Sequence, residues 1–375
     1  MFVLNGKYTD AIVYTDEIDE ATTAQILAMI NEPITKDTTV RIMSDCHVGK
    51  GATIGTTIRF HDTIERIVPN IVGVDIGCGI MMRKLKQGSV IDLDKLDTII
   101  KKYIPSGFSV HSRSSKAFNK ELADLIVPVP VDKKNRMRKS IGTLGGGNHY
   151  IELAQDENDE MWLSVHSGSR SLGVSVASHY QKLTNKTPAI DSKKEKNFID
   201  SIYAPLTGNT INHYLHDMAI AQQFAKLNRS TMLNTIVEAM NWEYEDSFDS
   251  IHNYIDSKNK IIRKGATSAQ LGERLVIPLN MRDGSLICEG KGNEEWNFSA
   301  PHGAGRVLSR TAAKKKIDLA VYVKQMQDVY TTSVRSSTLD EAPDAYKPFE
   351  EIVENIQDTV NINHHLKPLY NYKAH

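Results

Sequence analysis

The chain has 375 residues, of which 40% are hydrophobic and 24% are charged, a composition typical of a soluble globular protein that needs no disulfide bonds. Its 45 basic and 46 acidic residues give a net charge of −1, so the overall charge shows no basic excess for nucleic acid, although a local basic patch is compatible with it. The three cysteines (Cys46, Cys78 and Cys288) are too few for a disulfide framework and fit a reducing cytoplasm, where a thiolate can bind a metal.

The N-terminal stretch MFVLNGKYTDAIVYTD has no basic segment followed by an apolar run, so we expect no signal peptide. No stretch approaches ~18 consecutive apolar residues, so we expect no membrane span and predict a cytoplasmic location. No proline- or serine-rich linker divides the chain. We therefore predict one large domain over residues 1–375, although many domains hold only ~100–200 residues.

Three stretches have apolar residues at helical spacing. Residues 17–32 begin with acidic side chains, residues 209–240 form one long helix or two consecutive helices, and residues 344–362 form the third helical stretch. Between them, the basic segment DKKNRMRKS at residues 132–140 is expected to be an exposed loop.

Strand-like runs occur in both halves of the chain and do not alternate regularly with helices. They are TTVRIM (38–43), RIVPNIVGV (66–74), YIELA (150–154), WLSVH (162–166) and RLVIPL (274–279). This order favours an α+β fold, with mixed or antiparallel sheets surrounded by helices, over a doubly wound parallel sheet.

Glycines gather beside these strand-like runs. The clusters are HVGKGATIGTT (47–57), VGVDIGCGI (72–80), GTLGGGNHYIEL (142–153), HSGSRSLG (166–173) and PHGAGR (301–306). Glycine permits tight turns and a close approach of the backbone to a ligand. Because each cluster also carries Asp, Cys, His or Arg, we expect these loops to gather at one site.

The candidate metal ligands are one carboxylate, one thiol and three imidazoles: Asp75, Cys78, His149, His166 and His252. Such a set suits Zn²⁺, Mn²⁺ or Co²⁺. Five side chains exceed the needs of one tetrahedral ion, and a thiolate can bridge two ions, so two metals fit the set. The spacing alone is weak evidence, because the five are spread over 178 residues.

Each candidate also has an ordinary explanation. A cysteine in an apolar run is usually a small core residue, and a histidine usually makes only local hydrogen bonds. We expect helical flanks around His252. The remaining histidines are interpreted as structural or solvent-facing: His179, His213 and His216 on helical stretches, and His364 and His365 in a loop.

Taken together, the motifs resemble those of the RtcB family of RNA ligases. In order along residues 45–310, the matching stretches are DCHVGKGATIG, VGVDIGCG, GTLGGGNHYIE, HSGSRSLG, HNY, RKGAT, EGKGN and PHGAGRVLSR. The resemblance implies an RtcB-like fold with an active site on the glycine-rich loops. It also implies a GTP-dependent enzyme with two Mn²⁺ ions, or Zn²⁺ or Co²⁺ as alternatives, that joins RNA 2′,3′-cyclic phosphate or 3′-phosphate ends to 5′-hydroxyl ends.

The resemblance assigns the central chemical role to His302 in PHGAGR, which falls where the family carries the histidine that becomes guanylylated. Asp45 matches an orienting aspartate, and the five candidate ligands match the family's metal ligands, with Cys78 as the bridge. Arg170 and Lys264 match basic residues that are needed for activity, and Arg306 can bind phosphate oxygens. All three are expected to grip phosphate or the RNA end. The basic segment 132–140 is a further candidate for RNA contact.

The resemblance also implies a nucleotide pocket. Its members are Asn148, Glu152, Ser285, His302, Gly303, Ala304, Gly305, Tyr346 and Lys373. Within it, Glu152 matches the guanine contact, because a carboxylate accepts from both N1–H and N2–H of guanine and adenine offers no such pair. The chain departs from the family at Cys46, where the family has a valine-like residue, and at its end, which reads Lys373-Ala374-His375 instead of Lys-Gly.

Two other classes of function are weighed against the ligase. A metal-dependent hydrolase of RNA 3′-phosphate or cyclic-phosphate ends would have no need of a covalent nucleotide on His302. A non-catalytic RNA-binding scaffold would need neither the five ligands nor a nucleophile. We expect a monomer in RNA repair or tRNA splicing, with RNA as the partner and a small archease-type activator as a candidate second partner.

Overall fold

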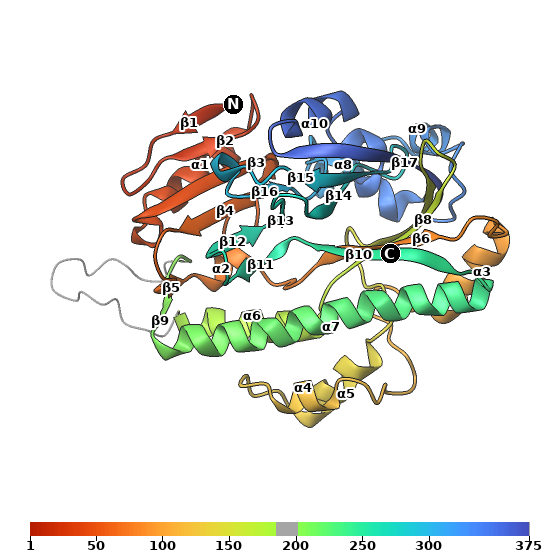
Figure 1. Cartoon of the computed structure of the whole chain (residues 1–375), viewed down its shortest axis with the longest axis horizontal. Coiled ribbons are helices and arrows are strands. Elements are labelled where there is room, and N and C mark those ends of the chain that lie inside the picture. Colours follow the sequence, from red (N-terminus) through yellow and green to blue (C-terminus); the bar gives the residue numbers. More distant parts are fainter. Residues whose placement is uncertain (185–201, 375) are drawn as a thin grey trace.

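The computed structural model describes residues 1–184 and 202–374 and has an α+β architecture, as predicted (Figure 1). One sheet has the strand order β1-β2-β3-β4-β12-β11. Its strands are β1 (Phe2–Leu4), β2 (Ala11–Val13), β3 (Thr38–His47), β4 (Ile54–Phe60), β12 (Ile261–Lys264) and β11 (Asn253–Asp256). Of its strand pairs, β2 and β3 are parallel and the others are antiparallel.

The second sheet is antiparallel, with the order β10-β6-β8-β7-β17-β15-β14. Its strands are β10 (Tyr244–Ile251), β6 (Gly79–Leu85), β8 (Met161–Ser167), β7 (Tyr150–Gln155), β17 (Val360–Lys373), β15 (Ser285–Gly290) and β14 (Arg274–Pro278). Two short pairs complete the strands, β13 (Ala266–Ser268) with β16 (Ser299–Pro301) and β5 (Arg66–Ile67) with β9 (Leu206–Thr207).

Helices surround the sheets. They are α1 (Glu20–Ile30), α2 (Pro69–Val72), α3 (Leu93–Tyr103), α4 (Asn119–Ala123), α5 (Val131–Lys139), α6 (Arg170–Thr184), α7 (Asn209–Met240), α8 (Arg310–Lys316), α9 (Leu319–Gln325) and α10 (Phe349–Ile356). Short 3₁₀ helices lie at η1 (Pro33–Thr35), η2 (Glu294–Trp296), η3 (Ser336–Glu341) and η4 (Pro343–Ala345). Among the described residues, no helix combines the length and the apolar character that a membrane crossing requires.

The C-terminal half of helix α7 packs under the second sheet, and its N-terminal half packs in a separate core cluster (Figure 1). The predicted alternative of two consecutive helices is excluded, because residues 209–240 contain neither glycine nor proline and run on without a break. Its apolar side chains Met232, Leu233 and Ile236 pack in one cluster with Leu163 and Val165 of β8. This cluster fixes the sheet strands that carry the site.

Two of the predicted helical and loop segments are wrong in part. Residues 132–140 form helix α5 and not a loop, because Lys and Arg favour helices and Met137 gives the helix one fully buried anchor. Residues 344–362 do not form one helix: α10 begins only after Pro348, which disfavours helix in the residue before it, and strand β17 begins at Val360.

Three strand and loop predictions also need correction. The run 66–74 is only a two-residue strand, after which Pro69 starts α2 at a position where a helix needs no backbone N–H. His364 and His365 lie in strand β17 and not in a loop. His252 joins β10 to β11, so its flanks are strands and not helices.

Candidate active site

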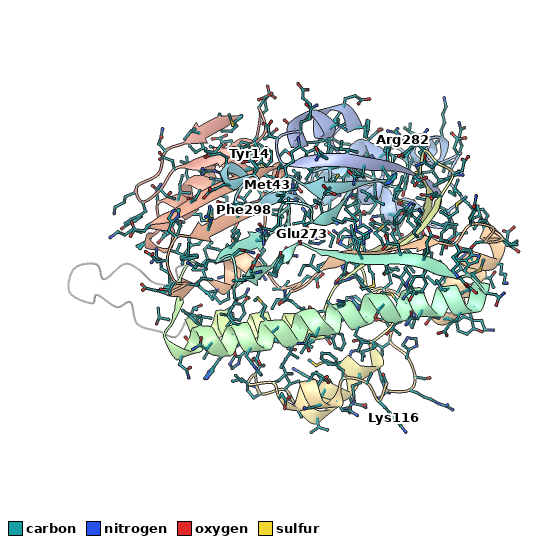
Figure 2. All side chains as sticks on the ribbon, viewed as in Figure 1. Tyr14, Met43, Lys116, Glu273, Arg282 and Phe298 are labelled. Carbon is teal, nitrogen blue, oxygen red and sulfur yellow. The ribbon has the colours of Figure 1, made fainter. Side chains whose placement is uncertain are left out.

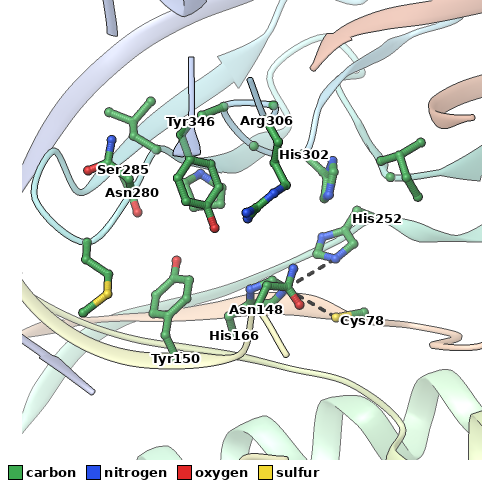
Figure 3. A pocket seen from close by; sticks show the side chains of 18 of the residues that line it. Cys78, Asn148, Tyr150, His166, His252, Asn280, Ser285, His302, Arg306 and Tyr346 are labelled. Atoms are coloured by element: carbon green, nitrogen blue, oxygen red, sulfur yellow. Dashed lines mark hydrogen bonds between the residues drawn. The ribbon is translucent and has the colours of Figure 1, made fainter. Parts of the chain in front are cut away.

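A cavity of about 280 Å³ opens between the two large sheets and is lined by the glycine-rich segments. Figure 3 shows His302, Arg306 and Tyr346 on one wall, with Cys78, His166 and Tyr150 on the other. The predicted residues that line it are Asp75, Cys78, Asn148, Glu152, His166, His252, Ser285, His302, Gly303, Ala304, Gly305, Arg306, Tyr346 and Lys373. The structure therefore brings together side chains that are scattered from Asp75 to Lys373 in the sequence.

The five candidate metal ligands form two groups that share one thiol. Cys78, His166 and His252 make one group, and Asp75, Cys78 and His149 make the other. Cys78 Sγ lies 3.3 Å from His166 Nε2 and 3.5 Å from His149 Nε2. Because Cys78 belongs to both groups, the arrangement fits the bridging role that the resemblance implies for it.

The ligand groups have separations and protonation states that suit metal binding. The Nε2 atoms of His166 and His252 lie 3.4 Å apart, close to the separation of two nitrogens that each lie ~2.0–2.1 Å from one tetrahedral ion. Burial lowers the pKa of both imidazoles well below the usual value, so both are neutral, the form that binds metals. The donor set therefore fits one or two borderline cations.

The thiol of Cys78 behaves differently. Its burial, together with the nearby Asp75 carboxylate, raises the pKa of this thiol well above its usual value in the protein alone. A bound cation reverses this effect, because it stabilises the thiolate directly. A thiolate at this position thus requires a cation beside it.

Backbone contacts orient the ligands. His149 Nδ1 lies 2.8 Å from the carbonyl oxygen of Leu144, to which it donates, and this leaves the Nε2 lone pair directed at the cluster. A Cβ at Gly168 would lie 2.1 Å from the Asp75 carboxylate oxygen, so any other residue there would displace this candidate ligand. From α7, the buried Arg229 donates to the carbonyls of Gly77 and Ser167, next to Cys78 and His166.

His302 stands beside this cluster and is held by Asp45. Its Nδ1 lies 2.6 Å from Asp45 Oδ2, and its backbone N–H donates to the same oxygen at 3.1 Å. The His302 ring centre is 4.8 Å from that of His252. With Nδ1 as the donor to the carboxylate, Nε2 carries the lone pair, which is the form a nucleophilic imidazole needs.

The PHGAGR turn packs directly on Asp45. Gly305 has φ of +77°, and a Cβ there would come within 2.8 Å of Asp45 Cα, so this position requires glycine. The following Arg306 lies over the Tyr346 ring at 4.8 Å, and its buried Nη1 makes no hydrogen bond, although it lies 3.8 Å from Glu341 Oε1. A guanidinium N–H without a hydrogen bond in this cavity suits a phosphate oxygen.

At the other end of the cavity, Glu152 is buried on β7. Burial raises its pKa to about 7, although the hydrogen bond from Asn371 and the charge of Lys373 act to lower it. Asn371 Nδ2 donates to Glu152 Oε2 at 2.8 Å across the β7–β17 pair. Ser285 lines the same end of the cavity. A buried carboxyl group with a spare oxygen suits a ligand with adjacent N–H donors.

Glu341, which sequence reasoning missed, contacts four polar side chains around the cavity. Its carboxylate lies 2.6 Å from Lys373 Nζ, 2.6 Å from Arg310 and 3.8 Å from Arg306, and it accepts from the Tyr346 hydroxyl at 2.8 Å. Burial alone would raise the pKa of Glu341, but the charges of Lys373 and Arg310 outweigh it and hold that pKa at about 2.

We predict that Glu341→Gln lowers the free energy of unfolding by about 3–5 kcal/mol, because breaking a buried ion pair leaves uncompensated buried charge. Urea unfolding near pH 7 measures this, with the exposed Glu354→Gln as the matched control. The carboxylate's contribution is present above pH 4.5 and is lost as the pH falls through about 2. A variant as stable as the control would show that the pairs are energetically neutral.

Two predicted basic residues lie outside the cavity lining. Arg170, at the start of α6, donates to the Gly107 carbonyl at 3.0 Å and to Thr143 Oγ1 at 3.3 Å. Lys264 donates to the carbonyls of Lys50 and Asn70 at 2.5 and 3.0 Å, and burial lowers its pKa to about 8. Both side chains brace loops at the site, and their predicted grip on an RNA end stays a prediction.

Other residues of the cavity also escaped sequence reasoning. They include His47, Asn253, Asn280, Met281 and Asn371. For His47, the sequence offers a signal, because this residue lies two positions after the predicted site residue Asp45. In the structure, His47 Nδ1 lies 3.0 Å from the Asp45 carbonyl oxygen. For Asn371, no local signal exists, since only the pairing of β17 with β7 places it beside Glu152.

Comparison with known proteins gives a consistent family match. The family model described as "tRNA-splicing ligase RtcB" matches residues 25–128 and 127–374. The chain is 31% identical to the RNA-splicing ligase RtcB of Escherichia coli K12, with 88% of each chain covered. It is 27% identical to the tRNA-splicing ligase RtcB of Nanoarchaeum equitans, with 83% of each chain covered.

Proposed function

Because the chain belongs to the RtcB family, we propose that it is a GTP-dependent RNA ligase that joins 2′,3′-cyclic phosphate or 3′-phosphate ends to 5′-hydroxyl ends. The observation that carries the proposal is the His302–Asp45 pair, placed beside a cluster of metal-ligand types in one cavity. The matched relatives named as RNA- and tRNA-splicing ligases support the reaction class.

In the first step of the proposed reaction, His302 Nε2 attacks the α-phosphorus of GTP. An N–P bond forms, the bond from that phosphorus to the bridging oxygen breaks, and pyrophosphate leaves. Asp45 accepts from Nδ1–H throughout, so it fixes the tautomer and stabilises the positive charge that develops on the ring. Arg306 Nη1, which makes no hydrogen bond within the protein, donates to a phosphate oxygen.

The residues that would hold metal are Asp75, Cys78, His149, His166 and His252, with Cys78 shared between two ions. A divalent cation here would polarise the phosphates and stabilise the leaving pyrophosphate. Mn²⁺ is our proposal for this site on the family resemblance, and Zn²⁺ or Co²⁺ fit the same donors.

The later steps use the same cavity. A 2′,3′-cyclic phosphate end must first add water, which breaks the bond from phosphorus to O2′ and gives the 3′-phosphate. The RNA 3′-phosphate attacks the phosphorus on His302, the N–P bond breaks, and the RNA end carries GMP through a new P–O–P bond. The 5′-hydroxyl then attacks the RNA phosphate and GMP leaves, which completes the phosphodiester. A labelled RNA pair with a 3′-phosphate and a 5′-hydroxyl should be joined in the presence of GTP and Mn²⁺. The same pair with a 3′-hydroxyl should not be joined.

Guanine preference should rest on Glu152. Glu152→Gln should weaken GTP binding by ~1–3 kcal/mol, about 5- to 150-fold, and narrow the preference over ATP, because an amide cannot accept both N1–H and N2–H. Since the pKa of Glu152 is about 7, the wild-type affinity for GTP should rise as the pH increases from 6 to 8. The GTP:ATP affinity ratio in Glu152→Gln should not change over this range.

Isothermal titration at several pH values with both nucleotides measures this. Glu273→Gln, on an exposed turn, is the control. A GTP:ATP affinity ratio in Glu152→Gln equal to that of the wild type would place the guanine contact elsewhere.

The physiological RNA, the archease-type activator, the monomeric state and the cytoplasmic location stay predictions.

The hydrolase alternative differs from the ligase in whether the reaction consumes GTP. A hydrolase would trim the 3′-phosphate without consuming a nucleotide, so release of inorganic phosphate from the RNA end in the absence of GTP would favour it.

A further inference from the structure

Residues 105–140, called here the basic arm, carry α4 and α5, and these two helices lie beyond α7 on the side away from the sheets (Figure 1). The basic arm contains eight Lys or Arg and three Asp or Glu, although the whole chain has a net charge of −1. Within the described part of the chain, none of these eight cations forms an ion pair. Lys116, labelled in Figure 2, projects from this surface. The basic arm is therefore a region of uncompensated positive charge.

Near the start of the basic arm, the aromatic side chain of Phe108 is exposed to solvent. The side chain of Phe108 is 96% exposed, which is unusual for a residue type that is normally buried. Its backbone is nevertheless fixed on both sides: Gly107 N–H donates to Gly145 at 2.6 Å, and Arg136 of α5 donates to the Phe108 carbonyl at 2.9 Å. The protein thus holds an aromatic face toward solvent on a braced loop.

The same loop connects to the candidate active site. The carbonyl of Gly107 accepts from Arg170, which lies close enough to Asp75 and Cys78 for their charges to act on its pKa. Gly145, the other contact of this loop, is three residues from Asn148, which lines the cavity. A chain of contacts therefore connects the neighbourhood of the metal-ligand cluster with the Phe108 loop and α5, through Arg170 and Arg136.

We propose that Phe108 and the basic arm bind the RNA strand whose end enters the cavity, with one base stacked on Phe108 and the phosphates against the exposed cations. This inference rests on the proposed function. Single-stranded nucleic acid is bound by the combination seen here, a positively charged track with an aromatic ring to stack a base. The exposed cations of the arm are Arg113, Lys116, Lys120, Lys133 and Arg136.

The aromatic contact is tested by fluorescence anisotropy with a short single-stranded RNA that ends in a 3′-phosphate. Phe108→Ala should weaken binding about 5- to 100-fold, and Phe108→Tyr should restore it, because stacking needs a ring and no particular base. Leu271→Ala, at a residue that is 82% exposed on a distant turn, is the matched control and should bind as the wild type does. Wild-type affinity in Phe108→Ala would overturn the proposal.

The electrostatic contact is tested by the charge reversals Lys116→Glu and Lys133→Glu, combined in one variant. The dependence of the RNA affinity on salt should become shallower, because fewer phosphates are neutralised. Lys36→Glu, at an exposed lysine outside the basic arm, should leave the slope unchanged. An unchanged slope in the double variant would assign the basic arm to another partner and contradict the proposal.

Guanylylation separates this proposal from the proposed function, because that step precedes RNA binding. Phe108→Ala that still accepts GMP from GTP but binds RNA weakly supports the surface. If the wild type takes no GMP but the Phe108→Ala substitution still weakens RNA binding, the ligase is contradicted and the RNA-binding surface is supported. If the wild type is guanylylated normally and Phe108→Ala binds RNA as tightly as the wild type does, the ligase is supported and the RNA-binding surface is contradicted.

Discussion

His302→Ala should lose ligation of 3′-phosphate ends by on the order of 10⁴-fold or more, because removal of a nucleophile leaves only binding and electrostatic contributions. None of the five candidate metal ligands is changed, so the variant should keep its metal content and its fold. Quantified ligation with metal analysis on the same preparation measures both effects.

Two comparisons sharpen this result. An RNA that already carries GMP on its 3′-phosphate should still be sealed by His302→Ala, because that substrate bypasses the nucleophile. Asp45→Asn keeps the imidazole but disrupts its tautomer, and should lose on the order of 10⁴-fold, as the equivalent change does in a catalytic triad. Substantial ligation by His302→Ala from GTP and 3′-phosphate RNA would contradict the assignment.

Cys78→Ser should lose at least one metal ion and nearly all activity. The thiol belongs to both ligand groups, so its loss removes one donor from each. A hydroxyl at this position is not ionised as a bridging thiolate is, and metal affinity depends on the deprotonated ligand. Inductively coupled plasma mass spectrometry on dialysed protein gives the metal content per chain.

The matched control is Cys288→Ser, another fully buried cysteine, which packs in a separate apolar cluster around β14 and β15. It removes the same sulfur atom from the same degree of burial and should keep its metal. If Cys78→Ser kept both its metal and its ligation activity while unfolding like Cys288→Ser, Cys78 would be a core residue and not a ligand.

Much of the site can be predicted from the sequence because its members lie in motifs. Cys78, His149 and His166 each lie near glycines at the end of a strand. The strands and turns around them bring the three side chains into the ligand groups that the motifs predict. His252 is instructive, because it reaches the cluster although its predicted helical flanks are wrong. The motif, and not its local secondary structure, carried the information.

The remainder depends on contacts between segments far apart in the chain. Glu341 meets Lys373 and Arg306 only after η3 and β17 have packed together, and no spacing in the sequence encodes that meeting. The sequence predicts part of strand β17 as loop, because its alternation is interrupted and its partners β15 and β7 lie far away in the sequence. The segment of helix α5 is predicted as a loop, because a run of charged residues resembles a solvated loop.

The most direct test of the central claim is the intact mass of the wild-type protein after incubation with GTP and Mn²⁺. We expect an increase of one guanylyl group per chain, with equimolar release of pyrophosphate, and peptide mapping should place the group on His302. The bond should be labile to acid and stable to alkali, as a phosphoramidate is. An unchanged mass with every divalent metal tried, or an adduct that persists in His302→Ala, would contradict the account.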